Sequence, residues 1–232
     1  MQNKTLKRII QHLIIYSAFV DHIGLMNGKM GIALFFYHLH GFTKNENHKR
    51  FANKLIEDIT GKLDYKIPRT FFDGLIGISW GFDHIIRNNF VAFEDEDMLT
   101  ELDKALLEIN ITNLFDESFS TGVRGIACYI VSRCSGKERI PTPFCKDYIC
   151  SLYERVSRID QKDPTAIHLQ NQLQRILNGN IIEYDLNLFY YLIGNEPYDD
   201  TNLFTPNRNI GIINNGYTGI AFRMLKNMEI TQ

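Results

Sequence analysis

The chain has 232 residues and a mass of 27.0 kDa, enough to bury a substantial core within a single domain. Its 25 basic and 27 acidic residues give a formal net charge of -2. The chain therefore lacks the excess of positive charge that is typical of nucleic-acid-binding proteins. Only 6 residues are proline while 12% are aromatic, a composition that favours packed helices and excludes disordered, collagen-like and coiled-coil chains.

The first predicted element is an amphipathic helix near the N-terminus. Its apolar residues Ile9, Leu13 and Ile14 follow helical spacing. Gln11 and His12 interrupt the apolar run, which argues against a signal peptide, and no stretch reaches the roughly 18 apolar residues of a membrane span. We therefore expect a cytoplasmic protein without a membrane span.

Four cysteines, Cys128, Cys134, Cys145 and Cys150, lie within one short stretch. Their spacings match no paired zinc-binding pattern, and a secreted disulfide scaffold would carry more cysteines in a smaller chain. Reduced, structural thiols are the interpretation, which agrees with a cytoplasmic location.

A repeated motif organises the rest of the chain. The pattern Gly-x-x-Gly-Ile-Ala/Ser begins at residues 28, 74, 122 and 216, at intervals of 46, 48 and 94 residues. Because 94 is twice 47, a fifth and degenerate copy is expected near residue 169, where residues 164–177 carry apolar positions but no glycines. The chain therefore reads as five repeats of about 47 residues.

Each repeat predicts a pair of helices. The segment after the glycines, such as 32–36 or 126–131, is apolar on nearly all sides and predicts a buried inner helix. An amphipathic outer helix follows, with the stripes Phe51/Leu55/Ile56/Ile59, Leu99/Leu102/Leu106/Ile109 and Leu152/Val156/Ile159, and a fourth is expected within 183–193. The chain starts with an outer helix and ends with an inner one containing Ile220, Phe222, Met224 and Leu225.

The predicted fold is therefore all-α, an α/α toroid or partial toroid of about five helical hairpins, as one domain over 1–232. Residues 194–213 form the longest irregular stretch, which is either a lid or rim loop or a long connection.

The paired glycines admit two interpretations. Spaced i, i+3 at a helix start, they allow close backbone packing in every repeat. Alternatively, unpaired amides of the helix N-terminus offer a place for an anion or polar ligand. The glycines concerned are Gly28, Gly31, Gly74, Gly77, Gly122, Gly125, Gly216 and Gly219.

The residue before each first glycine is polar. If the repeats superpose, Asn27, Asp73, Thr121 and Asn215 face a common rim that could bind a polar peptide or a sugar. Asp73 is the candidate catalytic carboxylate, a general base if its pKa is raised. The alternative is that these side chains cap the inner helices, since Asn, Asp and Thr are favoured caps.

The segments GLMNGKMGIALFF from Gly24, DGLIGISWG from Asp73 and NGYTGIA from Asn215 resemble the lanthionine synthetase C-like family. The resemblance implies an α/α toroid with a glycine motif opening each inner helix, of which this chain is a shortened member, with five helix pairs instead of seven. In the family's cyclases a zinc ion activates a peptide cysteine, which adds to a dehydrated Ser or Thr to form a thioether.

The resemblance implies zinc ligands one and two residues before certain first glycines. Those positions here hold Met26/Asn27, Phe72/Asp73, Ser120/Thr121 and Asn214/Asn215. None is Cys or His, and amides, hydroxyls and one carboxylate do not make a comparable zinc site. We therefore expect no metal and no cofactor.

These observations lead to one main hypothesis and two alternatives. The main hypothesis is a zinc-free binding or accessory module in maturation of a ribosomal peptide, partnered by a precursor peptide or a modification enzyme and not itself a cyclase. One alternative is a glycan-active hydrolase or lyase using Asp73, for which no second carboxylate is evident. The other is a vestigial structural family member. A homo-oligomer is compatible with each.

Overall fold

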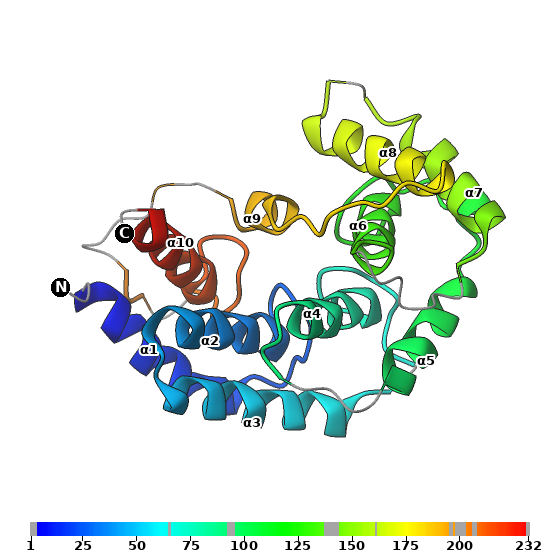
Figure 1. The fold of residues 1–232 in the computed structure, drawn as a ribbon. Helices are drawn as coiled ribbons and strands as arrows, with labels where there is room; N and C mark the ends of the chain where they lie inside the picture. Colours follow the sequence, from blue (N-terminus) through cyan, green and yellow to red (C-terminus); the bar gives the residue numbers. More distant parts are fainter. Residues whose placement is uncertain are drawn as a thin grey trace. The chain divides into compact units, whose positions relative to one another are not determined.

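The computed structural model describes residues 4–64, 66–91, 96–136, 144–160, 162–194, 197, 203–205 and 208–230 (Figure 1). Over these ranges every regular element is a helix and no strand is present, which confirms the all-α prediction. The ten α-helices of this part are α1 (Lys4–Tyr16), α2 (Lys29–Thr43), α3 (Glu46–Lys62), α4 (Leu75–Arg87), α5 (Glu96–Leu107), α6 (Val123–Arg133), α7 (Lys146–Val156), α8 (Pro164–Leu177), α9 (Asn187–Ile193) and α10 (Tyr217–Ile230).

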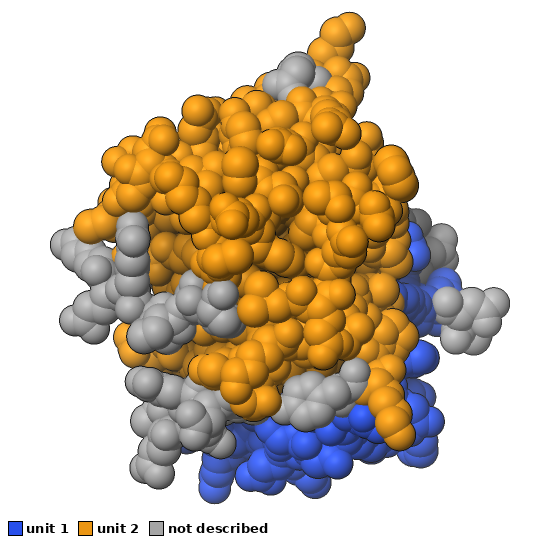
Figure 2. All heavy atoms as spheres, turned by 90° about the vertical axis from the view of Figure 1, so that its right-hand side faces the viewer, with its two compact units in different colours: residues 1–64, 189–232 blue, residues 65–188 orange. Residues whose placement is uncertain are grey.

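The chain forms two compact units, coloured separately in Figure 2. Unit 1 consists of residues 1–64 and 189–232, and unit 2 of residues 65–188. Helices α1, α2, α3 and α10 belong to unit 1, and α4 to α8 belong to unit 2. A single domain over 1–232 stays a prediction.

Unit 1 joins the two ends of the sequence. The inner helix α2 packs against α3 and α10, and α1 packs against α10. The Phe35 ring meets Phe36 at 5.3 Å and Phe222 at 5.5 Å, both edge to face. The first and last predicted repeats are therefore direct neighbours, and their aromatic residues build one core.

Unit 2 is built around two inner helices, α4 and α6, which pack against each other. Every residue of α4 from Leu75 to Ile85 is buried, as the apolar pattern predicted. The outer helix α5 packs on α4, and α7 packs on α6. Two residues of the predicted stripes, Ile109 and Ile159, lie beyond the ends of their helices, although Ile159 is still buried.

The degenerate fifth repeat forms α8 where the period placed it. This helix packs on α6 and α7 and buries one face, through Thr165, Ala166, Leu169 and Leu173. Of the apolar residues that mark this repeat in the sequence, Ile167, Leu173, Ile176 and Leu177, only Leu173 is buried and the other three are half-buried. Helix α8 therefore occupies the position of an inner helix in the repeat order, but it is buried on one face only, like an outer helix.

The last outer helix, α9, falls within the predicted range 183–193. Of the long stretch 194–213, much lies outside the described residues, and its role as a lid or rim loop stays a prediction. Its last residues, 208–213, are described and belong to the glycine motif that opens α10.

Candidate functional site

The four glycine motifs share one backbone arrangement. The first amide of each inner helix donates to a carbonyl seven or eight residues earlier, and each of these bonds is 2.9 Å long. The pairs are Lys29 to His22, Leu75 to Pro68, Val123 to Asp116, and Tyr217 to Asn209. The expectation that this amide is open to an anion is therefore wrong, because the preceding loop occupies it.

The first glycine of each motif permits this close approach. A Cβ on Gly28, Gly74, Gly122 or Gly216 would lie within 3.0 Å of a loop carbonyl oxygen. The backbone of Gly74 is extended, with φ of -116°, so other residues could adopt its conformation. Glycine is required at this position because the loop needs the space that a side chain would fill, and not because the backbone conformation is restricted to glycine.

The second glycines are also crowded where their surroundings are described. A Cβ on Gly31, Gly125 or Gly219 would collide with the carbonyl oxygen of Leu25, Phe119 or Ile212, respectively. Gly77 donates its amide to the Thr70 carbonyl at 3.3 Å. Both glycines thus hold the loop against the first helical turn.

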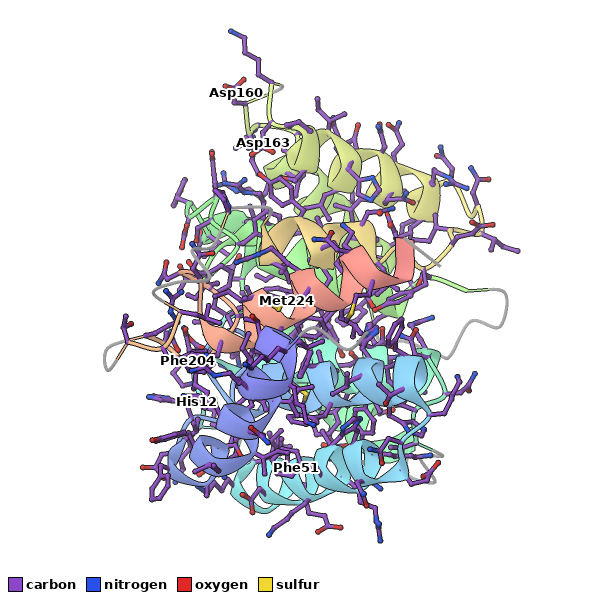
Figure 3. All side chains as sticks on the ribbon, turned by 90° about the vertical axis from the view of Figure 1, so that its left-hand side faces the viewer. His12, Phe51, Asp160, Asp163, Phe204 and Met224 are labelled. Atoms are coloured by element: carbon purple, nitrogen blue, oxygen red, sulfur yellow. The ribbon has the colours of Figure 1, made fainter. Side chains whose placement is uncertain are left out.

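The repeat without glycines starts its helix differently. The Asp163 carboxylate caps α8, accepting from the amides of Thr165 at 2.9 Å and Ala166 at 3.3 Å, and Pro164 opens the helix. The segment from Asp160 to Asp163 leads into this helix (Figure 3). A side-chain cap therefore replaces the backbone arrangement of the other four repeats.

In unit 1 two of the predicted rim residues lie in neighbouring loops, Asn27 in the loop before α2 and Asn215 in the loop before α10. Asn27 is half-buried and accepts a 2.7 Å hydrogen bond from the Asn209 side chain. Asn215 accepts from the Arg223 guanidinium at 2.5 Å, and its carbonyl accepts from Arg208 at 2.8 Å. Asn27 is not the N-cap of α2, because Gly28 holds that position without a side-chain bond.

A backbone bond ties the same two motifs together. The amide of Ile212 donates to the carbonyl of Met26 at 2.6 Å. Asn215 has a positive φ of 54°, a left-handed conformation that asparagine tolerates better than most residues. The Asn27–Asn209 side-chain bond and this backbone bond therefore link the first and last repeats, while the Asn215 bonds to Arg208 and Arg223 stay within the last repeat.

In unit 2 the other two rim residues lie in neighbouring loops. The amides of Phe71 and Phe72 donate to the Ser120 carbonyl at 2.8 and 3.3 Å, which links the loop before Asp73 to the loop before Thr121. Both predicted rim residues are exposed. Capping is again wrong as an explanation, since Gly74 and Gly122 are the N-caps and no side chain bonds there.

Thr121 is held by an acidic loop. Its hydroxyl donates to the Asp116 carboxylate and lies 3.2 Å from the Ser118 hydroxyl. The hydrogen bond from Thr121, with that from the Ser118 amide, lowers the pKa of Asp116. This carboxylate is therefore ionised at neutral pH and unsuited to a general acid.

The comparison with known families decides the identity of this repeat. Residues 20–179, more than half of the chain, match the family described as lanthionine synthetase C-like protein. The chain belongs to the lanthionine synthetase C-like family. Over the described residues the structure is all-helical, in agreement with the α/α-toroid fold class of that family. No curated protein matches the chain.

Membership of the lanthionine synthetase C-like family implies a zinc site of the kind found in its cyclases. The residues of this chain at the expected zinc-ligand positions do not fit a zinc ion. Met26 is fully buried, and Ser120 and Asn214 carry only a hydroxyl and an amide. In the described ranges no three or more His, Cys, Asp or Glu side chains gather as a group able to hold a metal ion. The donor chemistry is that of hard, weakly binding oxygens and amides rather than thiolate and imidazole.

The cysteines of this family member are free thiols in the structure. Cys128 is buried, Cys134 is half-buried, and Cys145 and Cys150 are exposed. Burial raises the pKa of the Cys128 thiol well above its usual range, so it is a neutral packing residue. None of the described helices combines the length and apolar character needed to cross a membrane.

A buried charge cluster in unit 2 was missed by the sequence interpretation. Arg133, fully buried at the end of α6, donates to Asp103 of α5 at 2.6 Å and lies 3.7 Å from Asp83 of α4. Asp83 also accepts from Arg87 at 2.7 Å, and Asp103 accepts from the Tyr129 hydroxyl at 2.6 Å. The cluster connects three helices.

The balance of charges explains how this cluster is tolerated. Burial raises the pKa of Asp103, while hydrogen bonds from Arg133 and Tyr129 oppose that shift. The sequence did contain a clue, because Asp83 and Arg133 are charged residues within the mostly apolar inner helices α4 and α6. Charged residues in such helices are expected to pair.

Three cavities are lined by residues outside the glycine motifs. One of 240 Å³ in unit 1 lies among apolar residues of α1 and α2, including Ile10, Leu39 and Phe42. In unit 2, a polar one of 820 Å³ adjoins Arg175 and Glu183, and one of 20 Å³ adjoins Cys128. The predicted rim residues line none of these three.

Proposed function

We propose that this chain is a zinc-free member of its family that binds a precursor peptide or a modification enzyme during maturation of a ribosomal peptide. The observation that carries the proposal is the chemistry of the family's ligand positions. In four motifs these positions hold no Cys or His, and in unit 1 Asn27 accepts a hydrogen bond from Asn209 while Asn215 accepts one from Arg223.

The intact scaffold supports binding rather than cyclisation. All four motifs keep the glycines and the 2.9 Å bonds that shape the loops. Thioether formation by the family's route needs a Lewis acid to lower the pKa of the attacking thiol. Without a thiolate or imidazole at these positions, the loops can present polar groups to a peptide but do not supply that activation.

Two exposed side chains of unit 2 are the proposed contacts. Asp73 and Thr121 face solvent in neighbouring loops, and both offer hydrogen-bonding groups to a peptide backbone or side chain. Asp73 is exposed on its loop, whereas the paired carboxylates of a glycan-active site face one another across a cleft. A glycan-active enzyme is therefore not favoured by any described feature.

The first experiment measures zinc. Protein produced in zinc-supplemented medium is purified without chelator and analysed by inductively coupled plasma mass spectrometry. We expect far less than one zinc per chain, and a stoichiometric zinc that survives dialysis would overturn the zinc-free assignment.

The second experiment measures peptide binding by isothermal titration, with a synthetic peptide rich in Cys, Ser and Thr, the residues that thioether formation joins, as the probe. We expect equal affinity with and without EDTA, and weaker binding by the double variant Asp73→Asn/Thr121→Ala. A double variant at two exposed sites outside the motifs, Lys146→Gln/Lys162→Gln, is the matched control. Failure of the peptide to bind the native protein would refute the peptide partner.

A further inference from the structure

Exposed apolar side chains gather at one place on unit 1. Of the seven large apolar residues exposed in the described part of the chain, four lie within residues 14–19. They are Ile14, Ile15, Tyr16 and Phe19, with exposed fractions of 43%, 60%, 48% and 78%. We call these four residues the α1 tip. Single exposed apolar residues are common on protein surfaces, but a contiguous group of them marks a surface that a membrane or another molecule covers.

The α1 tip is held rigidly by its buried neighbours. Leu13 is fully buried and Ser17 is 2% exposed, with the Ser17 hydroxyl donating to the Ile14 carbonyl at 3.3 Å. The His12 ring stacks on Tyr16 at 4.2 Å and contacts Tyr217, a buried residue of α10, also at 4.2 Å. The exposure of the tip is therefore a feature of the packed fold and not of a frayed helix end.

The helix that carries the tip is basic. Lys4, Lys7 and Arg8 are exposed, and residues 4–20 contain no acidic side chain, although the whole chain carries a net charge of -2. Arg8 lies over the Phe204 ring at 4.3 Å, next to His12 (Figure 3). The first acid after the tip is Asp21, which pairs with Lys62 at 3.8 Å.

We propose that the α1 tip inserts into the surface of an anionic lipid bilayer, with the basic residues of α1 at the headgroups. Each residue of a helix is rotated by about 100° from the one before it. The three exposed side chains of residues 14–16 therefore span about 200° of the helix circumference. A docked helix or strand covers one stripe of such a surface, whereas immersion covers all sides at once.

The spacing along the helix supports this arrangement. From Arg8 to Ile15 the axial rise is about 10 Å, which matches the depth to which interfacial segments bury apolar residues below the headgroups. Basic residues at that level gain from anionic lipid, and the same charges disfavour pairing of the tip with a second copy of itself. Tyr16 is of the type that settles at the membrane interface.

Vesicle co-sedimentation tests the proposal. The native protein is mixed with vesicles of phosphatidylcholine alone or of phosphatidylcholine with phosphatidylglycerol. We expect binding only to the mixed vesicles, and weaker binding in high salt. Phe19→Ser should lower the partition coefficient at least about tenfold, because it removes the most exposed apolar group. Phe115→Ser is the matched control, since Phe115 is 76% exposed but isolated in unit 2.

Charge and depth are tested separately. Lys4→Gln/Lys7→Gln should weaken binding and flatten its salt dependence, while Lys146→Gln/Lys162→Gln should change neither. The fluorescence of Phe19→Trp should shift to the blue on mixed vesicles and be quenched by brominated acyl chains, and that of Phe115→Trp should not. Circular dichroism confirms that each variant is folded.

Three results would overturn the proposal. The first is no binding of the native protein to mixed vesicles at low salt, and the second is equal binding by Phe19→Ser. The third is light scattering that shows a dimer which Phe19→Ser dissociates, because the tip would then be an interface between two copies. The vesicle assay contains no peptide, so its outcome is independent of the proposed peptide-binding function.

Discussion

The buried cluster of unit 2 makes a sharp stability prediction. Arg133→Met keeps most of the side-chain volume but removes the guanidinium that bonds Asp103 and approaches Asp83, both fully buried. Asp83 retains its 2.7 Å bond from Arg87, whereas Asp103 keeps only the Tyr129 hydroxyl as a donor within this cluster. The change therefore leaves an under-compensated carboxylate at the junction of α4, α5 and α6.

The expected magnitude follows from this geometry. Breaking a buried ion pair by removing one partner costs about 3–5 kcal/mol, and protonation of Asp103 limits the loss. Because the pKa of Asp103 is already raised by burial, removal of Arg133 raises it further. The folded variant then binds more protons than the unfolded chain, so its deficit in stability is small near pH 4 and grows as the pH rises.

Guanidinium unfolding followed by tryptophan fluorescence measures this loss. Trp80 is the single tryptophan of the chain, is 3% exposed and lies on α4 in the same unit as the cluster. The control is Arg69→Met, because Arg69 pairs with Glu108 in an exposed bridge and should lose only about 0–1 kcal/mol. Adding Asp103→Asn to Arg133→Met should recover part of the stability by removing the buried charge.

Two outcomes would contradict this reasoning. If Arg133→Met loses no more stability than Arg69→Met, the buried pair contributes little. If Asp103→Asn in the Arg133→Met background brings no recovery, the loss comes from packing and not from charge.

The remaining predictions concern packing, pH and loop contacts. Gly74→Ala should lose about 2–4 kcal/mol in chemical denaturation because its Cβ meets the Pro68 carbonyl, whereas Gly41→Ala, inside α2 with nothing within 4 Å, should gain up to about 1 kcal/mol. Burial lowers the pKa of His38 from 6.5 to about 4, so the unfolded chain takes up a proton first and stability should fall by about 2–3 kcal/mol as the pH drops through that range. His38→Gln should flatten this loss in melts at several pH values. Asn27→Ala should lose about 1 kcal/mol, and adding Asn209→Ala should cost about 1 kcal/mol more, since the Asn209 side chain also accepts a 2.8 Å hydrogen bond from the Gly211 amide.

The repeat period predicted the order of helices well because its evidence is local. Each glycine motif marks a loop and a helix start, and the apolar segment after it is buried as expected in α2, α4 and α6. The period also located α8, although that repeat lacks glycines and starts with the Asp163 cap. A helix start needs only a few neighbouring residues, so sequence spacing was sufficient.

The charge cluster and the loop contacts could not be predicted in the same way. Asp103 and Arg133 are 30 residues apart, and Asn27 and Asn209 are 182 residues apart. Pairing over such separations depends on how helices pack, which periodicity does not specify. The capping hypothesis failed for a different reason, because a backbone carbonyl seven or eight residues before each helix occupies the place where a side-chain cap was expected.

The backbone arrangement of the motifs bears on why the ligand positions differ from the family's. In all four motifs the first helical amide is bonded by a loop carbonyl, so the residue before each glycine is not needed as a cap. Positions 73 and 121 are exposed, so a Cys or His in place of Asp73 or Thr121 would not have to pack against the buried inner helix. The fold therefore does not exclude zinc donors there. Under the proposed function their replacement reflects what the loops bind, and the zinc measurement and the Asp73→Asn/Thr121→Ala variant test that proposal directly.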